Sequence, residues 1–168
     1  MQHNLTTTSW ACLAGSLLFV LVQLGWQWAH GGIEAHHLFA DPKQPALSNA
    51  WGLLLMPLLG AGTAWRLRRS SQVRPVLLAL AGSLMYGALL SVLFLSGLES
   101  LLLPALGVLF VLALWLPLYR AEYVLGFVAG FSLAIGNVLP LLPATPIVLL
   151  ALLALGLKTL WRRQRAAA

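Results

Sequence analysis

The chain has 168 residues, of which 60% are hydrophobic and 8% are charged, with a mean hydropathy of +0.88 and a formal net charge of +6. Soluble domains carry roughly 45–50% apolar and about 25% charged residues, so this composition excludes a soluble protein. The positive charge does not indicate nucleic-acid binding, because the arginines flank apolar runs in the manner of membrane-flanking charge. The expected surroundings of the chain are therefore a lipid bilayer.

Apolar runs separated by polar residues predict an all-α, polytopic transmembrane helical bundle with about six spans. A helix needs about 20 apolar residues to cross the hydrocarbon core, so the chain has no room for a separate soluble domain. We therefore expect residues 1–168 to form a single integral membrane domain. The expected spans are at about 9–29, 48–66, 74–96, 100–118, 122–142 and 145–161, and residues 30–47 form a loop.

Several span ends have a local physical reason. Ser48 is a candidate N-cap for the second span, and Pro75 suits the first turn of the third. Thr145 followed by Pro146 predicts the start of the sixth span in the same way. Residues 75–119 would measure about 65 Å as one helix, so we expect them to fold back at residues 96–100.

Basic residues predict the orientation of the bundle. With six spans, nine of the ten Lys and Arg residues fall on one side, and Lys43 falls on the other. Because Lys and Arg are enriched in cytoplasmic loops, we expect both termini in the cytoplasm and the loop 30–47 outside, in a bacterial inner membrane. We expect the first span to be retained, because residues 1–10 carry no Lys or Arg and no small-x-small cleavage site precedes His30.

Small residues recur at every fourth position in two spans. They are Ser83, Gly87 and Ser91 in one span, and Gly126, Gly130 and Ala134 in the other. This spacing lets helix backbones approach closely in lipid, so we interpret both stripes as helix packing surfaces.

Polar side chains form a stripe on the first span. Gln23, Gln27 and His30 follow the i, i+4, i+7 spacing of one helix face. Polar groups that face lipid are costly, so this face is expected to turn toward the bundle interior. Further polar residues expected in the outer half of the bundle are Ser48, Asn49, Glu99 and Asn137. Together these residues predict a polar pocket that opens outward.

The loop that follows holds candidate metal ligands. His30, His36, His37 and Asp41 offer imidazole and carboxylate donors, which suit Zn, Cu or Fe. Their spacing matches no established metal motif, and the glycines after His30 would have to supply an irregular backbone. Asp41 could act as a ligand or orient one, and Glu34 and Asp41 are the candidate acid–base residues.

A simpler interpretation uses the same residues without a metal. Histidines at a membrane surface often hydrogen-bond only to backbone or lipid headgroups, and Asp41 before Pro42 can cap a turn. Three functional hypotheses remain: a metal-dependent protein acting on a lipid or other apolar substrate, a non-catalytic subunit or assembly factor that docks a membrane-protein partner through the loop, and a small-solute or proton-coupled transporter. The last is disfavoured, because few ionisable groups are expected near the middle of the membrane.

Overall fold

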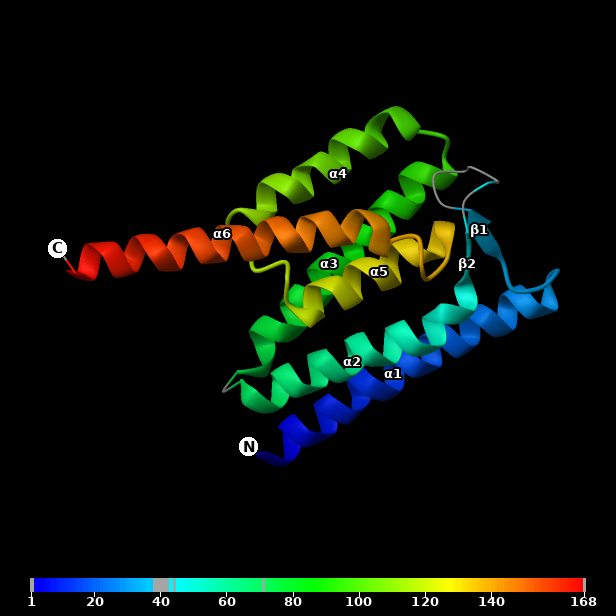
Figure 1. Cartoon of the computed structure of the whole chain (residues 1–168). Coiled ribbons are helices and arrows are strands. Elements are labelled where there is room, and N and C mark those ends of the chain that lie inside the picture. Colours follow the sequence, from blue (N-terminus) through cyan, green and yellow to red (C-terminus); the bar gives the residue numbers. More distant parts are fainter. Residues whose placement is uncertain (1, 38–42, 44, 71, 168) are drawn as a thin grey trace.

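The computed structural model describes residues 2–37, 43, 45–70 and 72–167; of residues 2–5, 37, 99 and 167 it describes the backbone only. Over these ranges the chain is helical except for a short antiparallel hairpin, a 3-10 turn and the connections (Figure 1). The helices are α1 (Gln2–Ala29), α2 (Gly52–Arg69), α3 (Val73–Leu95), α4 (Glu99–Ala113), α5 (Ala121–Ile135) and α6 (Leu141–Ala167). The all-helical fold predicted from hydropathy is confirmed.

The helices pack as three pairs, two of which join helices that are not neighbours in the sequence. α1 packs along α2, α3 along α5, and α4 along α6, with α3 and α5 in the most extensive contact. The α3–α5 pair lies between the other two (Figure 1). α5 is the centre of the bundle, because residues 125–132 are all buried. A helix that is apolar and buried on every face is expected only in a protein interior.

Close backbone contact explains the pairing of α3 with α5. A Cβ atom added at Gly130 would collide with the Leu84 carbonyl oxygen, and one at Gly87 would lie 2.8 Å from the Phe131 backbone nitrogen. The Ser91 hydroxyl donates to the Gly130 carbonyl oxygen at 2.9 Å. The interpretation of the small-residue stripes as packing surfaces is confirmed.

Within the described residues, three helices are long and apolar enough to cross a membrane. They are Thr6–Ala29 within α1, all of α3, and Leu141–Ala166 within α6. Helices α4 and α5 are apolar but have 15 residues each, which corresponds to about 22 Å at 1.5 Å per residue. α2 has 18 residues, with three arginines in its last turn. The composition and these helices together identify a membrane protein.

Several helix ends differ from the sequence prediction. α1 begins at Gln2 and not at about residue 9, α4 ends at Ala113 and not at about 118, and α6 continues to Ala167, beyond about 161. α5 stops at Ile135 because Gly136 adopts a φ of 79°, which ends the helix seven residues before the predicted limit. α6 begins at Leu141, so the prediction that Thr145 and Pro146 start it is wrong. Pro143 already occupies the first turn, where a missing N–H costs little. The Thr145 hydroxyl instead donates to the Leu141 carbonyl oxygen at 2.7 Å.

A small hairpin between α1 and α2 was not predicted. Strands β1 (Ala35–His37) and β2 (Ala46–Ser48) pair antiparallel, with His36 opposite Leu47. The 3-10 turn η2 (Asn49–Trp51) then leads into α2, and Ser48 caps it by accepting from the Ala50 N–H at 3.2 Å. Ser48 is therefore an N-cap, but of η2; the prediction that it caps the second span is wrong, because the N-cap of α2 is Trp51.

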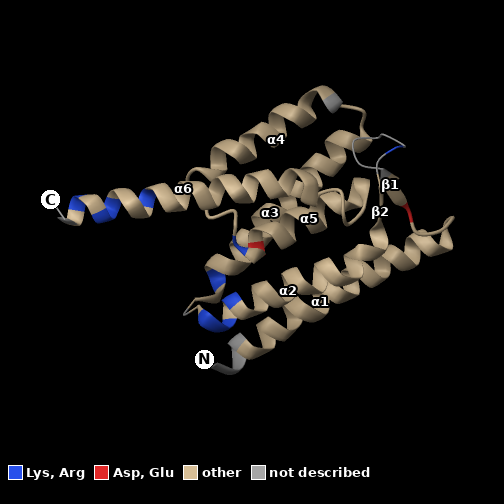
Figure 2. Cartoon of the chain, in the orientation of Figure 1, with Lys and Arg blue, Asp and Glu red and all other residues tan. Residues whose placement is uncertain are grey.

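Charge separates the two ends of the bundle. Most of the basic residues gather at the end where α2 and α6 finish, on the side of the two termini (Figure 2), whereas Glu34 immediately precedes β1 and Lys43 lies between β1 and β2 in the sequence. We call these the arginine end and the hairpin end.

Candidate functional site

Gln23 and Gln27 of the predicted polar stripe face the bundle as expected, but the prediction is wrong for His30, which is exposed. The Gln23 side-chain Nε2 donates to the Ser132 carbonyl oxygen on α5 at 2.7 Å. This hydrogen bond fixes the amide orientation, because a carbonyl oxygen can only accept. The Oε1 atoms of Gln23 and Gln27 are buried and have no hydrogen-bond partner among the described residues. Two buried acceptors thus lack a hydrogen-bond partner, although buried polar groups in proteins normally have one.

These acceptors lie in a groove at the hairpin end. The groove encloses about 410 Å³ between residues 19–27 of α1 and residues 132–136 at the end of α5, with Glu34 also lining it. Val22 and Leu133 on its walls are 64% and 61% exposed. In a membrane bundle such exposed apolar side chains face lipid. The groove is therefore polar on its floor and open to the bilayer at its side.

Two buried asparagines lie behind the groove. Asn49 and Asn137 are both 0% exposed, and neither side-chain amide has a hydrogen-bond partner among the described residues. A Cβ atom added at Gly136 would collide with the Asn49 amide, and one added at Gly52 would lie 2.8 Å from the Asn137 Cβ. Both glycines thus leave room for an asparagine at the junction of η2 with the end of α5. Asn137 was predicted to lie within the fifth span, but it belongs to the turn between α5 and α6.

The candidate metal ligands do not come together in the structure. Among the described residues, no group of three or more His, Cys, Asp or Glu side chains is placed to hold a metal ion. The exposed His30 ring stacks on Trp26 with centroids 3.8 Å apart, and its Nδ1 donates to the Trp26 carbonyl oxygen at 2.9 Å. His36 Nε2 lies 3.5 Å from the Glu34 carboxylate. His30 is therefore an exposed histidine that hydrogen-bonds to its own helix, whereas His36 Nε2 is buried and has no hydrogen-bond partner among the described residues.

Some of the predicted residues cannot be placed. Asp41 lies outside the described residues, and the structure describes only the backbone of His37 and Glu99. The metal hypothesis, with His30, His36 and His37 as ligands and Asp41 as a ligand or an orienting residue, therefore stays a prediction. The proposed acid–base role of Glu34 also stays a prediction, with its carboxylate now placed beside the groove.

A buried ion pair was missed by the sequence analysis. Glu122, in the first turn of α5, is 1% exposed, and its Oε1 accepts from Arg66 Nε at 3.1 Å. The Arg66 side chain is 34% exposed, so it reaches from the surface into the interior. The available signal was an acid at the edge of an apolar run, because intramembrane acids normally have a partner.

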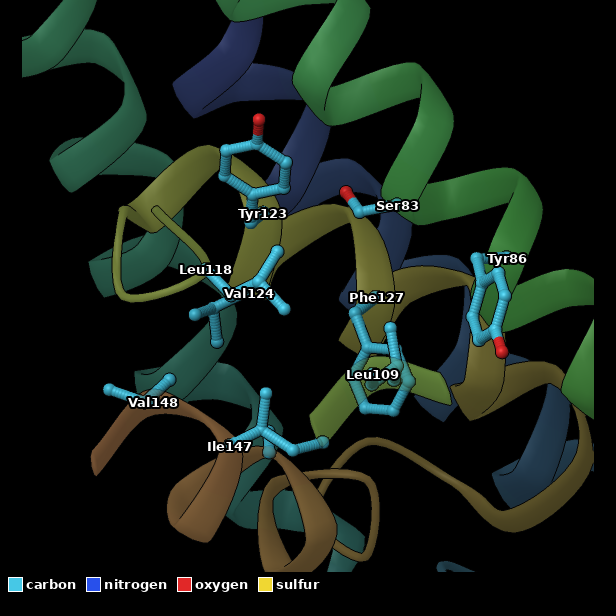
Figure 3. Close-up of a pocket in the computed structure, with 10 residues that line it drawn as sticks. Ser83, Tyr86, Leu109, Leu118, Tyr123, Val124, Phe127, Ile147 and Val148 are labelled. Atoms are coloured by element: carbon cyan, nitrogen blue, oxygen red, sulfur yellow. The ribbon is translucent and has the colours of Figure 1, made fainter. Parts of the chain in front are cut away.

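A second cavity lies inside the bundle between α3, α4, α5 and α6 (Figure 3). Its volume is about 40 Å³, and apolar side chains such as Phe127 and Ile147 surround it. Tyr86 also lines this cavity, and its hydroxyl donates a hydrogen bond to the Ala105 carbonyl oxygen at 2.6 Å. Ligand pockets usually measure about 300–1,000 Å³, so this cavity is a packing gap. Other hollows of the described chain measure about 360 and 450 Å³, and the groove is the candidate site because two unpartnered amide oxygens belong to residues that line it.

No known protein family, curated protein or solved structure matches the chain in sequence or fold comparisons.

Proposed function

We propose that this multi-pass membrane protein binds an amphipathic lipid in the groove between α1 and α5. The observation that carries the proposal is the pair of unpartnered acceptors, Gln23 Oε1 and Gln27 Oε1, on the floor of a groove with lipid-facing walls. Leaving buried acceptors unpaired costs about 1–3 kcal/mol each, which a ligand that donates hydrogen bonds would recover. A lipid can reach such a groove from the bilayer without leaving its apolar surroundings.

The polar lining determines which headgroup would fit. The groove offers two amide oxygens and the Glu34 carboxylate, and no Lys or Arg is among the described residues that line it. Acceptors and a negative charge favour a headgroup that donates hydrogen bonds, above all an ammonium group. Phosphatidylethanolamine presents three N–H donors, whereas phosphatidylcholine has a methylated nitrogen and presents none. The proposal therefore favours the first lipid over the second.

Chemistry on the bound lipid would involve Glu34, because it is the one ionisable residue among the described residues that line the groove. A carboxylate there can accept a proton from a headgroup hydroxyl or ammonium group, and it can donate the proton back. A metal held by the histidines, docking of a partner through residues 30–47, and solute transport remain predictions from the sequence.

Replacing both glutamines of the groove with leucine is expected to abolish the headgroup preference. In the delipidated protein, native mass spectrometry should show tighter binding of phosphatidylethanolamine than of phosphatidylcholine with the same chains. Two hydrogen bonds at about 0.7 kcal/mol each correspond to about a tenfold preference, which Gln23→Leu/Gln27→Leu removes.

The matched control is Gln72→Leu/Gln164→Leu, which makes the same chemical change at exposed positions of the arginine end. This control should keep the preference. Equal binding of the two lipids by the wild-type protein, or equal loss of the preference in both double variants, would contradict the proposal.

The number of crossings and the orientation belong to the same proposal. We infer six crossings, with the arginine end in the cytoplasm and the hairpin end outside. Successive helices run in alternating directions between the two ends (Figure 1). Residues 125–132 of the shorter α5 are buried, so most of this helix is shielded from lipid by the other helices, although Leu133 near its end is 61% exposed. The concentration of arginines at one end supports the orientation.

Cysteine labelling tests this topology. In a Cys12→Ala background, Lys43→Cys should react with a membrane-impermeant thiol reagent on intact cells, whereas Gln72→Cys should react only after the cells are opened. The reason is that the two residues lie at opposite ends of the proposed bundle. Labelling of position 72 alone on intact cells would reverse the orientation, and equal labelling of both positions would rule out the topology.

A further inference from the structure

A cationic hollow lies at the arginine end, on the opposite end of the bundle from the groove. It measures about 220 Å³ and is formed by residues 113–120, at the end of α4 and in the following connection, together with residues 151–158 of α6. The packing of α4 against α6 brings these two segments together. Neither segment contributes to the groove between α1 and α5.

Two basic residues line this hollow. Arg120 immediately precedes α5, whose first backbone N–H groups add partial positive charge at the same point. Lys158 comes from α6, and its Nζ donates to the Leu114 carbonyl oxygen on the edge of the hollow. This hydrogen bond holds the ammonium group near the hollow, although the Lys158 side chain is exposed.

No acid compensates these two cations. No Asp or Glu is among the described residues that line the hollow, and the guanidinium of Arg120 has no ion pair or hydrogen bond with a described residue. Glu122 is the acid nearest to Arg120 in the sequence; its Oε1 pairs with Arg66, its Oε2 has no hydrogen-bond partner among the described residues, and it forms no ion pair with Arg120. Positive charge is thus concentrated at the hollow, where Arg120 is half-buried and Lys158 is exposed.

The remaining walls suit a membrane interface. Trp115 is 68% exposed and Tyr119 is half-buried, and both line the hollow together with apolar residues such as Leu155. Aromatic side chains favour the level of the lipid headgroups, where one part of the ring is apolar and the other is wet. The hollow therefore combines cations with the apolar and aromatic side chains that are typical of the headgroup level of a membrane.

We propose that this hollow binds the phosphate of an anionic phospholipid, with Arg120 and Lys158 contacting the phosphate and the walls contacting the start of the acyl chains. Basic pockets between membrane helices offer anionic headgroups both charge and hydrogen-bond donors. The occupant is a lipid and not a soluble anion, because the apolar and aromatic walls add contacts that a free phosphate cannot use. This inference does not depend on the function proposed for the groove.

The test is a native mass spectrometry titration of the delipidated protein with phosphatidylglycerol and, separately, with phosphatidylcholine of the same chains. The wild-type protein is expected to prefer phosphatidylglycerol. Each basic residue near an anionic lipid contributes about a fivefold effect, so Arg120→Gln/Lys158→Gln should lower the preference about 25-fold. Lys158→Gln alone, which alters an exposed side chain and leaves the fold intact, should lower it about fivefold.

Arg162→Gln/Arg163→Gln is the matched control, because it removes the same charge from exposed positions of α6 beyond the hollow. It should retain the preference. Equal losses in the two double variants would reduce the effect to general electrostatic attraction and overturn the site, as would a wild-type protein without any preference. Displacement of phosphatidylglycerol by an equal concentration of inorganic phosphate would assign the hollow to a soluble anion and overturn the lipid proposal.

Discussion

Replacing Arg66 with methionine is expected to lower the free energy of unfolding by about 3–5 kcal/mol, the usual cost of leaving one member of a buried ion pair alone. The cost arises from the residue that remains. Glu122 is 1% exposed, so its carboxylate would lose its counter-ion in a place that water does not reach. Denaturant unfolding in mild detergent measures the loss.

Removing the acid of the pair should lower the stability much less than removing the arginine. Glu122→Gln removes the buried charge, and the Arg66 side chain, 34% exposed, can turn its guanidinium toward water. Adding Glu122→Gln to the Arg66→Met protein should therefore restore most of the lost stability, since no buried charge remains. Equal losses for the two single variants, or a double variant less stable than Arg66→Met, would contradict this account.

The second large effect is expected between α3 and α5. Gly87→Ala should destabilise the protein by about 1–3 kcal/mol, because the new methyl group would meet the Phe131 backbone nitrogen at 2.8 Å and collide with the Phe127 carbonyl oxygen. Backbone atoms cannot move aside as a flexible side chain would, so the two helices must separate. Thermal unfolding in detergent measures the change.

Gly82→Ala is the matched control on the same helix. A Cβ atom at Gly82 would have no neighbour within 4 Å, so the same substitution should be neutral or stabilise the helix by up to about 1 kcal/mol. If the two variants have the same unfolding midpoint, the close approach of α3 and α5 does not limit stability.

Hydropathy predicted the helical fold because backbone N–H and C=O groups without hydrogen bonds are costly in an apolar medium. A helix satisfies these groups within one segment, so few alternatives to helices remain. The small-residue stripes were predictable for a similar reason, since close helix contact requires small side chains at a fixed spacing. Pairing was not predictable, because nothing local in the sequence of α3 states that its partner is α5 and not the adjacent α4. The burial of Glu122 depends on that pairing and was missed with it.

The candidate site was predicted in part. The stripe of Gln23 and Gln27 follows from helical periodicity and was placed on the correct face. Asn49 and Asn137 were expected in a polar pocket, but their places depend on Gly136 ending α5 early, which an apolar run conceals. The hairpin was not predicted because strands of three residues carry too little periodicity to be recognised.

The position of α5 between α2 and α3 imposes an order on biosynthesis. The pair of helices α1 and α2 can form as soon as both have left the ribosome. The face of α3 that carries Gly87, however, has no partner until α5 has been made. The 40 residues from Leu95 to Ile135 take about 2–8 s at 5–20 residues per second. During that interval α4 must fold without occupying the place of α5, and Arg66 has no acid to pair with, because Glu122 has not yet been synthesised. A newly made chain is therefore most exposed to misassembly and to quality-control proteases while α4 is emerging.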